Sequence, residues 1–366
     1  MLTAWMMKWA KENNIDCTQD EVGNLIFRKP ATKGMENRVP VILQAHVDMV
    51  PQANSNKKHD FTKDPIEPMI GEDGWVRANG TTLGADDGIG GAAALAILAS
   101  KTIAHGPLEV LLTIDEETGM TGAFGLKKGA LKGEILINLD SETEGELYVG
   151  CAGGIDATIT IDYKMEKTPA NYCACKLSIG GLKGGHSGMD IILGRGNANK
   201  LLFRHLRWVA ECGIRLIAID GGNMRNAIPR EAYAVVGVPS KMKEKFEKSA
   251  KQFCEDVKEE FRLTEPDMRL TLSDMPMVEE VVDMAAQCNL LAALVGVPNG
   301  VLAMSAAIPT LVETSTNLAS VQFSGKQKVV VTTSQRSSVE SAKEYAKMAV
   351  ESVFLLAGAE VEHSDG

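Results

Sequence analysis

The 366-residue sequence predicts an α/β protein in which a mostly parallel sheet is followed by an inserted α+β unit. Two observations support this class. Over residues 20–150 short apolar runs alternate with helical stretches, which is typical of a parallel sheet covered by helices. Beyond that part, strands and helices follow one another without this alternation. We therefore expect a first domain over 1–162, a second over 163–358, and the start of a return to the first over 359–366.

Local patterns define the elements of the first domain. An amphipathic helix is expected in MLTAWMMKWAKENNID, where lysines alternate with apolar residues. The stretch GIGGAAALAILAS is too long and too rich in small residues for a strand, so it is predicted to be a buried helix. Strands are expected in NLIFRK, VPVILQAH, LEVLLTIDEE and EILINLDSE.

The second domain shows the same two kinds of pattern in a different order. Helices are expected in GNANKLLFRHLRWVAE, KMKEKFEKSAKQFCEDVKEEFR and SVESAKEYAKMAVESVFLLAG. We interpret His205, in the first of these helices, as a structural residue. Strands are expected in CKLSIGGLKGG, IRLIAIDGG, EAYAVVGV and TNLASVQFSGKQKVVVTTSQR.

Composition excludes several classes of function. The net charge of -10 would repel phosphates, so no nucleic-acid partner is expected. No apolar run approaches the roughly 20 residues that a membrane span requires, so no membrane partner is expected either. The seven cysteines have no framework spacing, and we expect them to be reduced in a cytoplasmic protein.

Side chains of the kinds that bind metal ions, a histidine and several carboxylates, follow three of the predicted strands in the first domain. Open α/β sheets build their sites at the carboxyl ends of their strands, so these groups are expected to meet at one edge. They are His46 and Asp48 after the first strand, Asp115, Glu116 and Glu117 after the second, and Asp140 and Glu142 after the third.

His46 and Asp48 are two residues apart, so in a strand they point the same way. Asp48 would then orient the imidazole of a metal-binding His46. A hydrogen-bonded surface pair is the alternative for such a motif alone, and the other acidic strand ends favour the metal site.

The segment GTTLGADDGIGG places Asp86 and Asp87 at the start of the predicted buried helix. Glycines before a helix suit a phosphate, but two carboxylates would repel one, and no P-loop lysine follows. A nucleotide-binding protein is therefore disfavoured. Asp86 is placed to bridge two metal ions, while one of the two aspartates caps the helix.

Glu116 and Glu117 are adjacent carboxylates that repel each other unless a cation or a proton lies between them. One of them as a metal ligand and the other as a general base would resolve this repulsion. The base would take a proton from a water whose pKa the metal lowers. A solvated acidic turn is the alternative.

Several stretches together resemble one known family along essentially the whole chain. They are HVDMVPQ, HDFTKDPI, RANGTTLGADDGIG, HGPLEVLLTIDEETGM, GAFGL, LINLDSETEGE, GCAGGID, LKGGHSG and NAIPRE. This pattern is similar to the di-zinc peptidases of the aminoacylase and carboxypeptidase clan, and within it to the bacterial aminoacyl-histidine dipeptidases. The resemblance implies a cytoplasmic zinc-dependent dipeptidase that acts on small dipeptides, with Co²⁺ or Mn²⁺ as alternative metals.

The resemblance also assigns roles in the first domain. It makes Glu116 the general base and Asp48 the residue that orients a ligand. One zinc would be held by His46, Asp86 and Asp140, and the second by Asp86 and Glu117.

In the second domain, a lone histidine in a glycine-rich turn would ordinarily be a surface residue. The resemblance instead implies a lid that forms a homodimer, in which His186 stabilises an oxyanion in the partner's site. It implies that Arg336 holds the carboxylate of the substrate and that Asn226 contacts the substrate.

The family pattern begins before Met1 and continues beyond Gly366, where it supplies a further histidine ligand. The resemblance therefore implies a chain shortened at both ends, with one zinc bound well, the second poorly, and apolar surface exposed on the sheet. Two other functions remain open: an N-acyl-amino-acid deacylase or carboxypeptidase of the same clan, and an impaired remnant that still dimerises.

Overall fold

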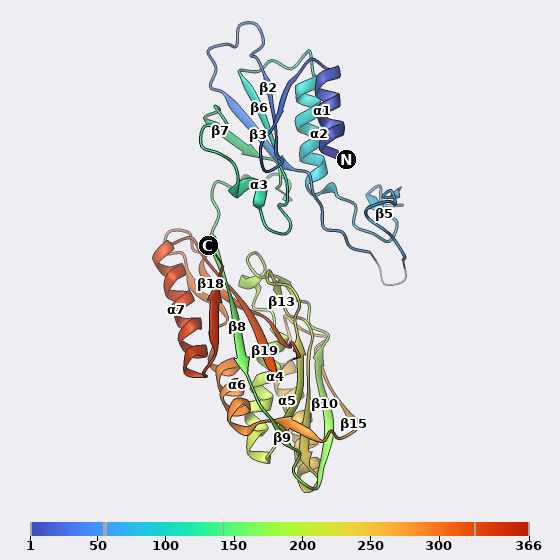
Figure 1. Ribbon diagram of the computed structural model, residues 1–366, viewed down its shortest axis with the longest axis vertical. Coiled ribbons are helices and arrows are strands. Elements are labelled where there is room, and N and C mark those ends of the chain that lie inside the picture. Colours follow the sequence, from blue (N-terminus) through green and yellow to red (C-terminus); the bar gives the residue numbers. More distant parts are fainter. Residues whose placement is uncertain (1, 54–56, 142, 326, 365–366) are drawn as a thin grey trace. The chain divides into compact units, whose positions relative to one another are not determined.

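The computed structural model describes residues 2–53, 57–141, 143–325 and 327–364, and the chain forms two compact units, Met1–Val149 and Gly150–Gly366 (Figure 1). The boundary lies earlier than the one expected after residue 162. The reason is that β8 (Gly153–Asp162) pairs with β19 (Lys328–Ser337) in the sheet of the second unit. Strand β20 (Glu360–His363) pairs with the other edge of β8. Within the described residues, the segment from 359 onward therefore stays in the second unit instead of returning to the first.

The first unit is a sheet with helices packed against it. Its elements are α1 (Leu2–Glu12), β1 (Asp16–Gln19), β2 (Leu25–Lys29), β3 (Val41–His46), β4 (Pro68–Ile70), β5 (Val76–Ala78), α2 (Ala85–Ala99), β6 (Leu108–Thr113), α3 (Thr121–Phe124) and β7 (Ile135–Asn138). The main sheet has the order β1-β2-β6-β3-β7. The predicted parallel pairing holds for β6, β3 and β7, whereas β1, β2 and β6 pair antiparallel.

The two faces of this sheet are covered unequally. Helices α1 and α2 lie together on one face (Figure 1), where residues such as Phe27, Leu43 and Val110 are buried with Leu98 of α2. A smaller cluster, which includes Ile42, forms on the other face. Every residue of β6 is buried, as expected for a central strand with both faces covered.

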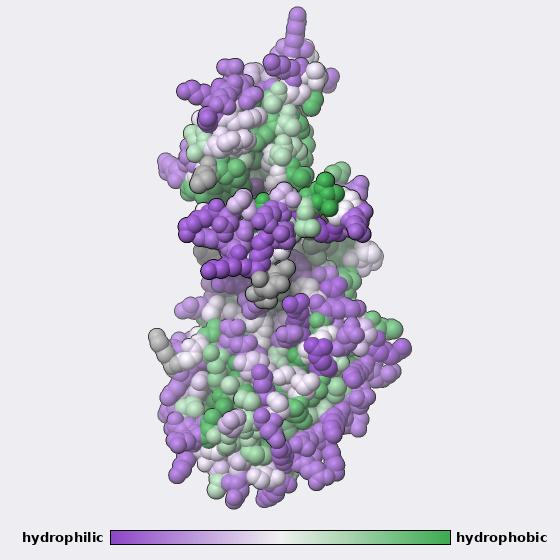
Figure 2. Space-filling view, turned by 90° about the vertical axis from the view of Figure 1, so that its right-hand side faces the viewer, coloured by the Kyte–Doolittle hydropathy of each residue, from purple (hydrophilic) through white to green (hydrophobic). Residues whose placement is uncertain are grey.

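Strand β7 is an edge strand with exposed apolar side chains. Ile135, Leu136 and Ile137 are each about half exposed, at 47%, 51% and 45%. This agrees with the expectation of apolar surface on the sheet. Figure 2 shows hydrophobic residues reaching the surface among hydrophilic ones in both units.

The second unit is built on one long antiparallel sheet. Its remaining elements are β9 (Met165–Lys167), β10 (Tyr172–Gly180), β11 (Gly185–His186), α4 (Ala198–Trp208), β12 (Arg215–Gly221), β13 (Ala227–Ile228), β14 (Ala232–Pro239), α5 (Lys243–Glu260), β15 (Arg269–Met275), β16 (Glu280–Val282), α6 (Met284–Gly296), β17 (Gly300–Met304), β18 (Val312–Phe323) and α7 (Glu340–Leu356), with short 3₁₀ turns at Ile191–Leu193, Val209–Cys212 and Ser240–Met242. The strand order is β15-β10-β14-β12-β18-β19-β8-β20, and β17 pairs with β18.

Helices α4 to α7 enclose the main core of the second unit. Leu177 of β10 and Ile159 of β8 are fully buried there, together with Phe203 of α4 and Phe354 of α7. Residues of β10 and β8 alternate between buried and half-buried, so one face of these strands packs on the helices and the other is partly open. No helix within the described residues combines the length and apolarity needed to cross a membrane.

His205 of α4 is fully buried in this core, in agreement with a structural role. Its ring lies 4.9 Å from the ring of Phe253 and 6.0 Å from that of Phe246, measured between centroids. Neither ring nitrogen has a hydrogen-bond partner among the described residues. Burial lowers the pKa of His205 from 6.5 to about 4, because a charged ring cannot be solvated there.

This burial predicts an acid-sensitive second unit. Below pH 6.5 His205 becomes protonated in the unfolded chain but stays neutral in the folded chain. The free energy of unfolding therefore falls as the pH drops from 6.5 towards 4. The loss at pH 4 is roughly 3 kcal/mol, from about 1.4 kcal/mol for each pKa unit. Urea unfolding at pH 7 and pH 5 should show a smaller difference for H205L than for the wild type. Equal differences in the two proteins would contradict this assignment.

Candidate metal centre

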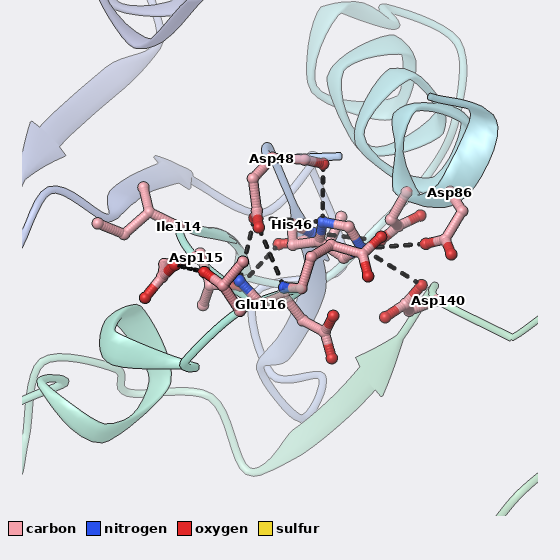
Figure 3. A network of polar contacts seen from close by, with 12 residues as sticks. His46, Asp48, Asp86, Ile114, Asp115, Glu116 and Asp140 are labelled. Atoms are coloured by element: carbon pink, nitrogen blue, oxygen red, sulfur yellow. Dashed lines mark hydrogen bonds and ion pairs between the residues drawn. The ribbon is translucent and has the colours of Figure 1, made fainter. Parts of the chain in front are cut away.

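Parallel pairing brings the acidic strand ends of the first unit to one edge of the sheet. His46, the last residue of β3, lies in register with Thr113 at the end of β6, and Gln44 lies in register with Asn138 at the end of β7. The turns that follow these strands deliver Glu116 and Asp140 beside His46, as Figure 3 shows. Glu142, also expected here, lies outside the described residues.

The two ring nitrogens of His46 face different residues. Its Nδ1 faces Asp48, at 3.1 Å from the carbonyl oxygen and 3.4 Å from Oδ1. Its Nε2 faces two carboxylates, at 3.0 Å from Asp86 Oδ1 and 3.7 Å from Asp140 Oδ1 (Figure 3). The residue is only 2% exposed. Asp48 therefore contacts one side of the ring, where it could orient it, and Nε2 points to where a cation would be shared with Asp86 and Asp140.

Donor atoms that could hold a metal ion form two groups around His46. One contains His46, Asp86 and Asp140, and the other contains His46, Glu116 and Glu117; within each group the donor atoms lie within 4.8 Å of one another. The first group matches the ligands expected for one zinc. Among the described residues, no such group of three joins Asp86 to Glu117, the pair expected for a second metal.

Asp48 also holds the turn that follows β6. Its Oδ1 accepts a hydrogen bond from the backbone N–H of Glu116, and its Oδ2 accepts one from that of Glu117, both at 3.1 Å. The same carboxylate thus faces His46 and fixes the backbone of both adjacent glutamates. Only the contact with His46 was expected from the sequence.

Asp87 fastens the start of α2 to the end of β3. Its Oδ1 accepts from the backbone N–H of Gly90 at 3.0 Å, and its Oδ2 accepts from the backbone N–H of His46 at 3.2 Å. Asp86 and Asp87 have non-helical backbone angles within α2, so Asp87 caps the regular helix that follows it. A Cβ atom on Gly90 would collide with this carboxylate and with the side chain of Leu139. The two contacts keep Asp86, the neighbour of Asp87, close to His46.

The pKa shifts at this edge show a surplus of negative charge. Burial, followed by a hydrogen bond with Asp86 and the neighbouring charges, raises the pKa of Asp140 well above its usual range. Burial and the other carboxylates also raise the pKa of both Glu116 and Glu117. Burial alone would lower the pKa of His46, but the surrounding carboxylates outweigh it and raise that pKa. Such a cluster fits a divalent cation, which would balance this charge through nitrogen and oxygen donors.

The residues expected to contact substrate from the second unit also lie together. His186 of β11 pairs with Ala227 of β13, and the backbone carbonyl of Asn226 accepts a hydrogen bond of 2.7 Å from Ser187. A Cβ atom on Gly188 would lie 3.1 Å from His186 Cε1 and 3.4 Å from Arg336 Cδ, so Gly188 separates the two side chains. His186, Asn226 and Arg336 therefore belong to one region of this unit.

The side chains that support this region were not expected from the sequence. Asp190 Oδ2 accepts the backbone N–H of His186, and Arg195 lies beside it. The only signal was the short spacing in HSGMD, in which an aspartate follows the histidine by one turn. Arg336 has its Nε buried without a partner among the described residues.

The fold and the acidic centre define a class of protein, the α/β metallohydrolases. Within that class, the chain belongs to peptidase family M20/M25/M40, whose family model matches residues 42–363.

Known proteins support this assignment. The chain is 47% identical over 362 residues to the cytosol non-specific dipeptidase of Escherichia coli (strain K12), a match that covers 99% of this chain and 74% of that protein. It also matches the crystal structure of aminoacylhistidine dipeptidase from Vibrio alginolyticus with a TM-score of 0.78 and 48% identity, again over 99% of this chain and 74% of the other. An uncharacterized protein of Bacillus subtilis (strain 168), YqjE, is 32% identical over 136 residues, 36% of this chain and 33% of its own length.

Proposed function

We propose that this protein is a metal-dependent dipeptidase that cleaves free dipeptides, including those of the aminoacyl-histidine (Xaa-His) type. The observation that carries the proposal is the grouping of His46 with Asp86, Asp140, Glu116 and Glu117 at one sheet edge. The names of the Escherichia coli and Vibrio relatives support the substrate class. In this proposal the protein acts in the cytoplasm.

Zinc is the metal we propose, with Co²⁺ or Mn²⁺ as alternatives. His46, Asp86 and Asp140 would hold one ion, because their donor atoms already converge. Asp86 and Glu117 would contribute to a second. A divalent cation here would polarise the peptide carbonyl and lower the pKa of a water molecule.

Glu116 is the proposed general base. It would take a proton from the attacking water and pass it to the leaving amine. Asp48 would hold this glutamate in place, because its carboxylate accepts the backbone N–H of Glu116.

The second unit, Gly150–Gly366, is the proposed lid and homodimer-forming domain. His186 would donate a hydrogen bond to the oxyanion that forms from the peptide carbonyl, in the active site of a partner subunit. Arg336 would bind the terminal carboxylate of the dipeptide, a task for which the planar guanidinium is suited. Asn226 would contact the substrate beside them.

A comparison of two substrates tests this function. The zinc-loaded protein is expected to cleave glycyl-histidine and to leave N-acetyl-histidine intact, because an acylated amine lacks the charge that a dipeptidase recognises. EDTA should abolish the activity and added Zn²⁺ should restore it. Cleavage of N-acetyl-histidine in preference to the dipeptide would instead identify a deacylase or carboxypeptidase. If the metal-loaded dimer cleaves neither substrate, the protein is an impaired remnant.

A further inference from the structure

We infer that Asp190 and Arg195 form a positioning pair that holds His186 in one ring orientation and one tautomer. This inference rests on the proposed role of His186 and assigns a purpose to two charged residues outside the predicted site. Neither residue is proposed to touch substrate. They act through the turn that carries the histidine.

Asp190 binds the backbone of His186 from two directions. Its Oδ2 accepts the backbone N–H of His186 at 2.8 Å. Its own backbone N–H donates to the carbonyl oxygen of His186 at 2.9 Å. These two hydrogen bonds close the turn over 186–190, so the position of the His186 backbone depends on the Asp190 side chain.

Arg195 completes the pair by contacting both Asp190 and the backbone just before the turn. Its Nη1 lies 3.4 Å from Asp190 Oδ2 and donates a hydrogen bond of 2.6 Å to the carbonyl oxygen of Gly184. The Asp190 and Arg195 side chains are only 31% and 24% exposed, so water screens this ion pair less than one on the open surface. Arg195 therefore links Asp190 to the chain that enters the turn.

The local backbone is shaped to admit these two side chains. Gly185, directly before His186, has φ +139°, a conformation that residues with a Cβ atom rarely adopt. A Cβ atom at this position would also collide with Arg195 Nη1 and Asp190 Oδ2. Since glycine alone leaves space for both charged groups, the turn and the pair are built together.

The backbone of this turn determines the tautomer of His186. The backbone N–H groups of Met189 and Gly188 point at His186 Nδ1, at 3.1 Å and 3.3 Å. A backbone N–H can only donate, so Nδ1 must accept and the ring proton resides on Nε2. An Nε2–H is the donor that an oxyanion needs, whereas the other tautomer would present a lone pair to it.

Variants of Asp190 test the inference by two independent readouts. In D190A, the ¹⁵N chemical shifts of the His186 ring should move from the Nε2–H pattern towards an average of both tautomers. The value of kcat for glycyl-histidine should fall by about tenfold to a hundredfold, with KM changed less than about twofold, because a misplaced group costs rate at the transition state. D190N retains one acceptor oxygen but loses the charge that faces Arg195, so it should recover both properties only in part.

Asp283 provides the matched control. It also accepts two backbone N–H groups through its carboxylate, from Ala286 at 2.9 Å and Lys164 at 2.8 Å, but at the start of α6. D283A should lower the stability of the unit without changing the His186 spectrum or kcat. If D190A and D283A have the same effects, or if D190A leaves the His186 tautomer unchanged, the positioning pair is refuted.

The two readouts also separate this inference from the proposed function. If the wild-type protein cleaves no dipeptide while D190A still shifts the His186 tautomer, the proposed function fails and the positioning pair stands. If the wild type cleaves dipeptides and D190A leaves the tautomer unchanged, the function stands and the positioning pair fails.

Discussion

Replacing Glu116 with glutamine is expected to lower kcat for dipeptide hydrolysis about a thousandfold, within the range that general acid–base catalysis contributes. Glutamine keeps the size of the side chain and the backbone N–H that Asp48 Oδ1 accepts, so the turn after β6 should be preserved. It removes only the carboxylate that can take a proton. The metal content of E116Q is therefore expected to equal that of the wild type.

The adjacent Glu117 is the control for this variant, because it lies in the same turn as Glu116. The backbone N–H groups of both glutamates donate to the Asp48 carboxylate, and burial is the first cause that raises the pKa of each. If Glu117 is a metal ligand, E117Q should weaken metal binding, which E116Q should not do. Competition with a chromophoric chelator measures the affinity, and a dipeptide assay at saturating metal measures kcat. The assignment of the base is wrong if E116Q retains activity, or if both variants lose metal to the same extent.

The convergence of the candidate metal-binding residues was predictable because it follows from strand topology. Parallel strands end at the same edge of a sheet, so His46 and Asp140 were expected at one edge. That β3 and β7 are neighbours, which brings the two residues together, was not predicted and comes from the structure. The local patterns of VILQAH and ILIN were clear enough to place both strands. The same argument could not predict that the Asp48 carboxylate accepts the backbone N–H groups of Glu116 and Glu117. These hydrogen bonds depend on the conformation of the turn that carries the two glutamates.

Other features were not predictable because their local signal was weak or ambiguous. Helix α6 has the sequence MAAQCNLLAALVG, which is apolar around most of its circumference, so no amphipathic stripe marked it as a helix. Strand β8 was expected in the first domain, which was predicted to extend to residue 162, but it pairs with β19, which lies far along the sequence. Pairing between distant strands is set by tertiary packing and not by the local pattern.

Replacing His46 with glutamine is expected to reduce metal affinity by at least about a hundredfold. His46 belongs to both donor groups of the site, whereas each of the carboxylates belongs to one. It also supplies the only neutral donor of the two groups, and removing it leaves acidic side chains that repel one another. The expected loss exceeds the tenfold to hundredfold that removal of a residue supporting a ligand typically causes.

A graded series of variants makes this prediction specific. D48N keeps the ligand but removes the charge that faces His46 Nδ1, so its affinity for Zn²⁺ or Co²⁺ should fall between those of H46Q and the wild type. H105Q removes another histidine of the first unit, whose Nδ1 contacts the backbone oxygen of Gly106 at 2.7 Å, and it should bind metal like the wild type. The visible spectrum of bound Co²⁺ reports the coordination directly. Equal affinity in H46Q and H105Q would exclude His46 as a ligand of the ion that is proposed to lie between His46, Asp86 and Asp140.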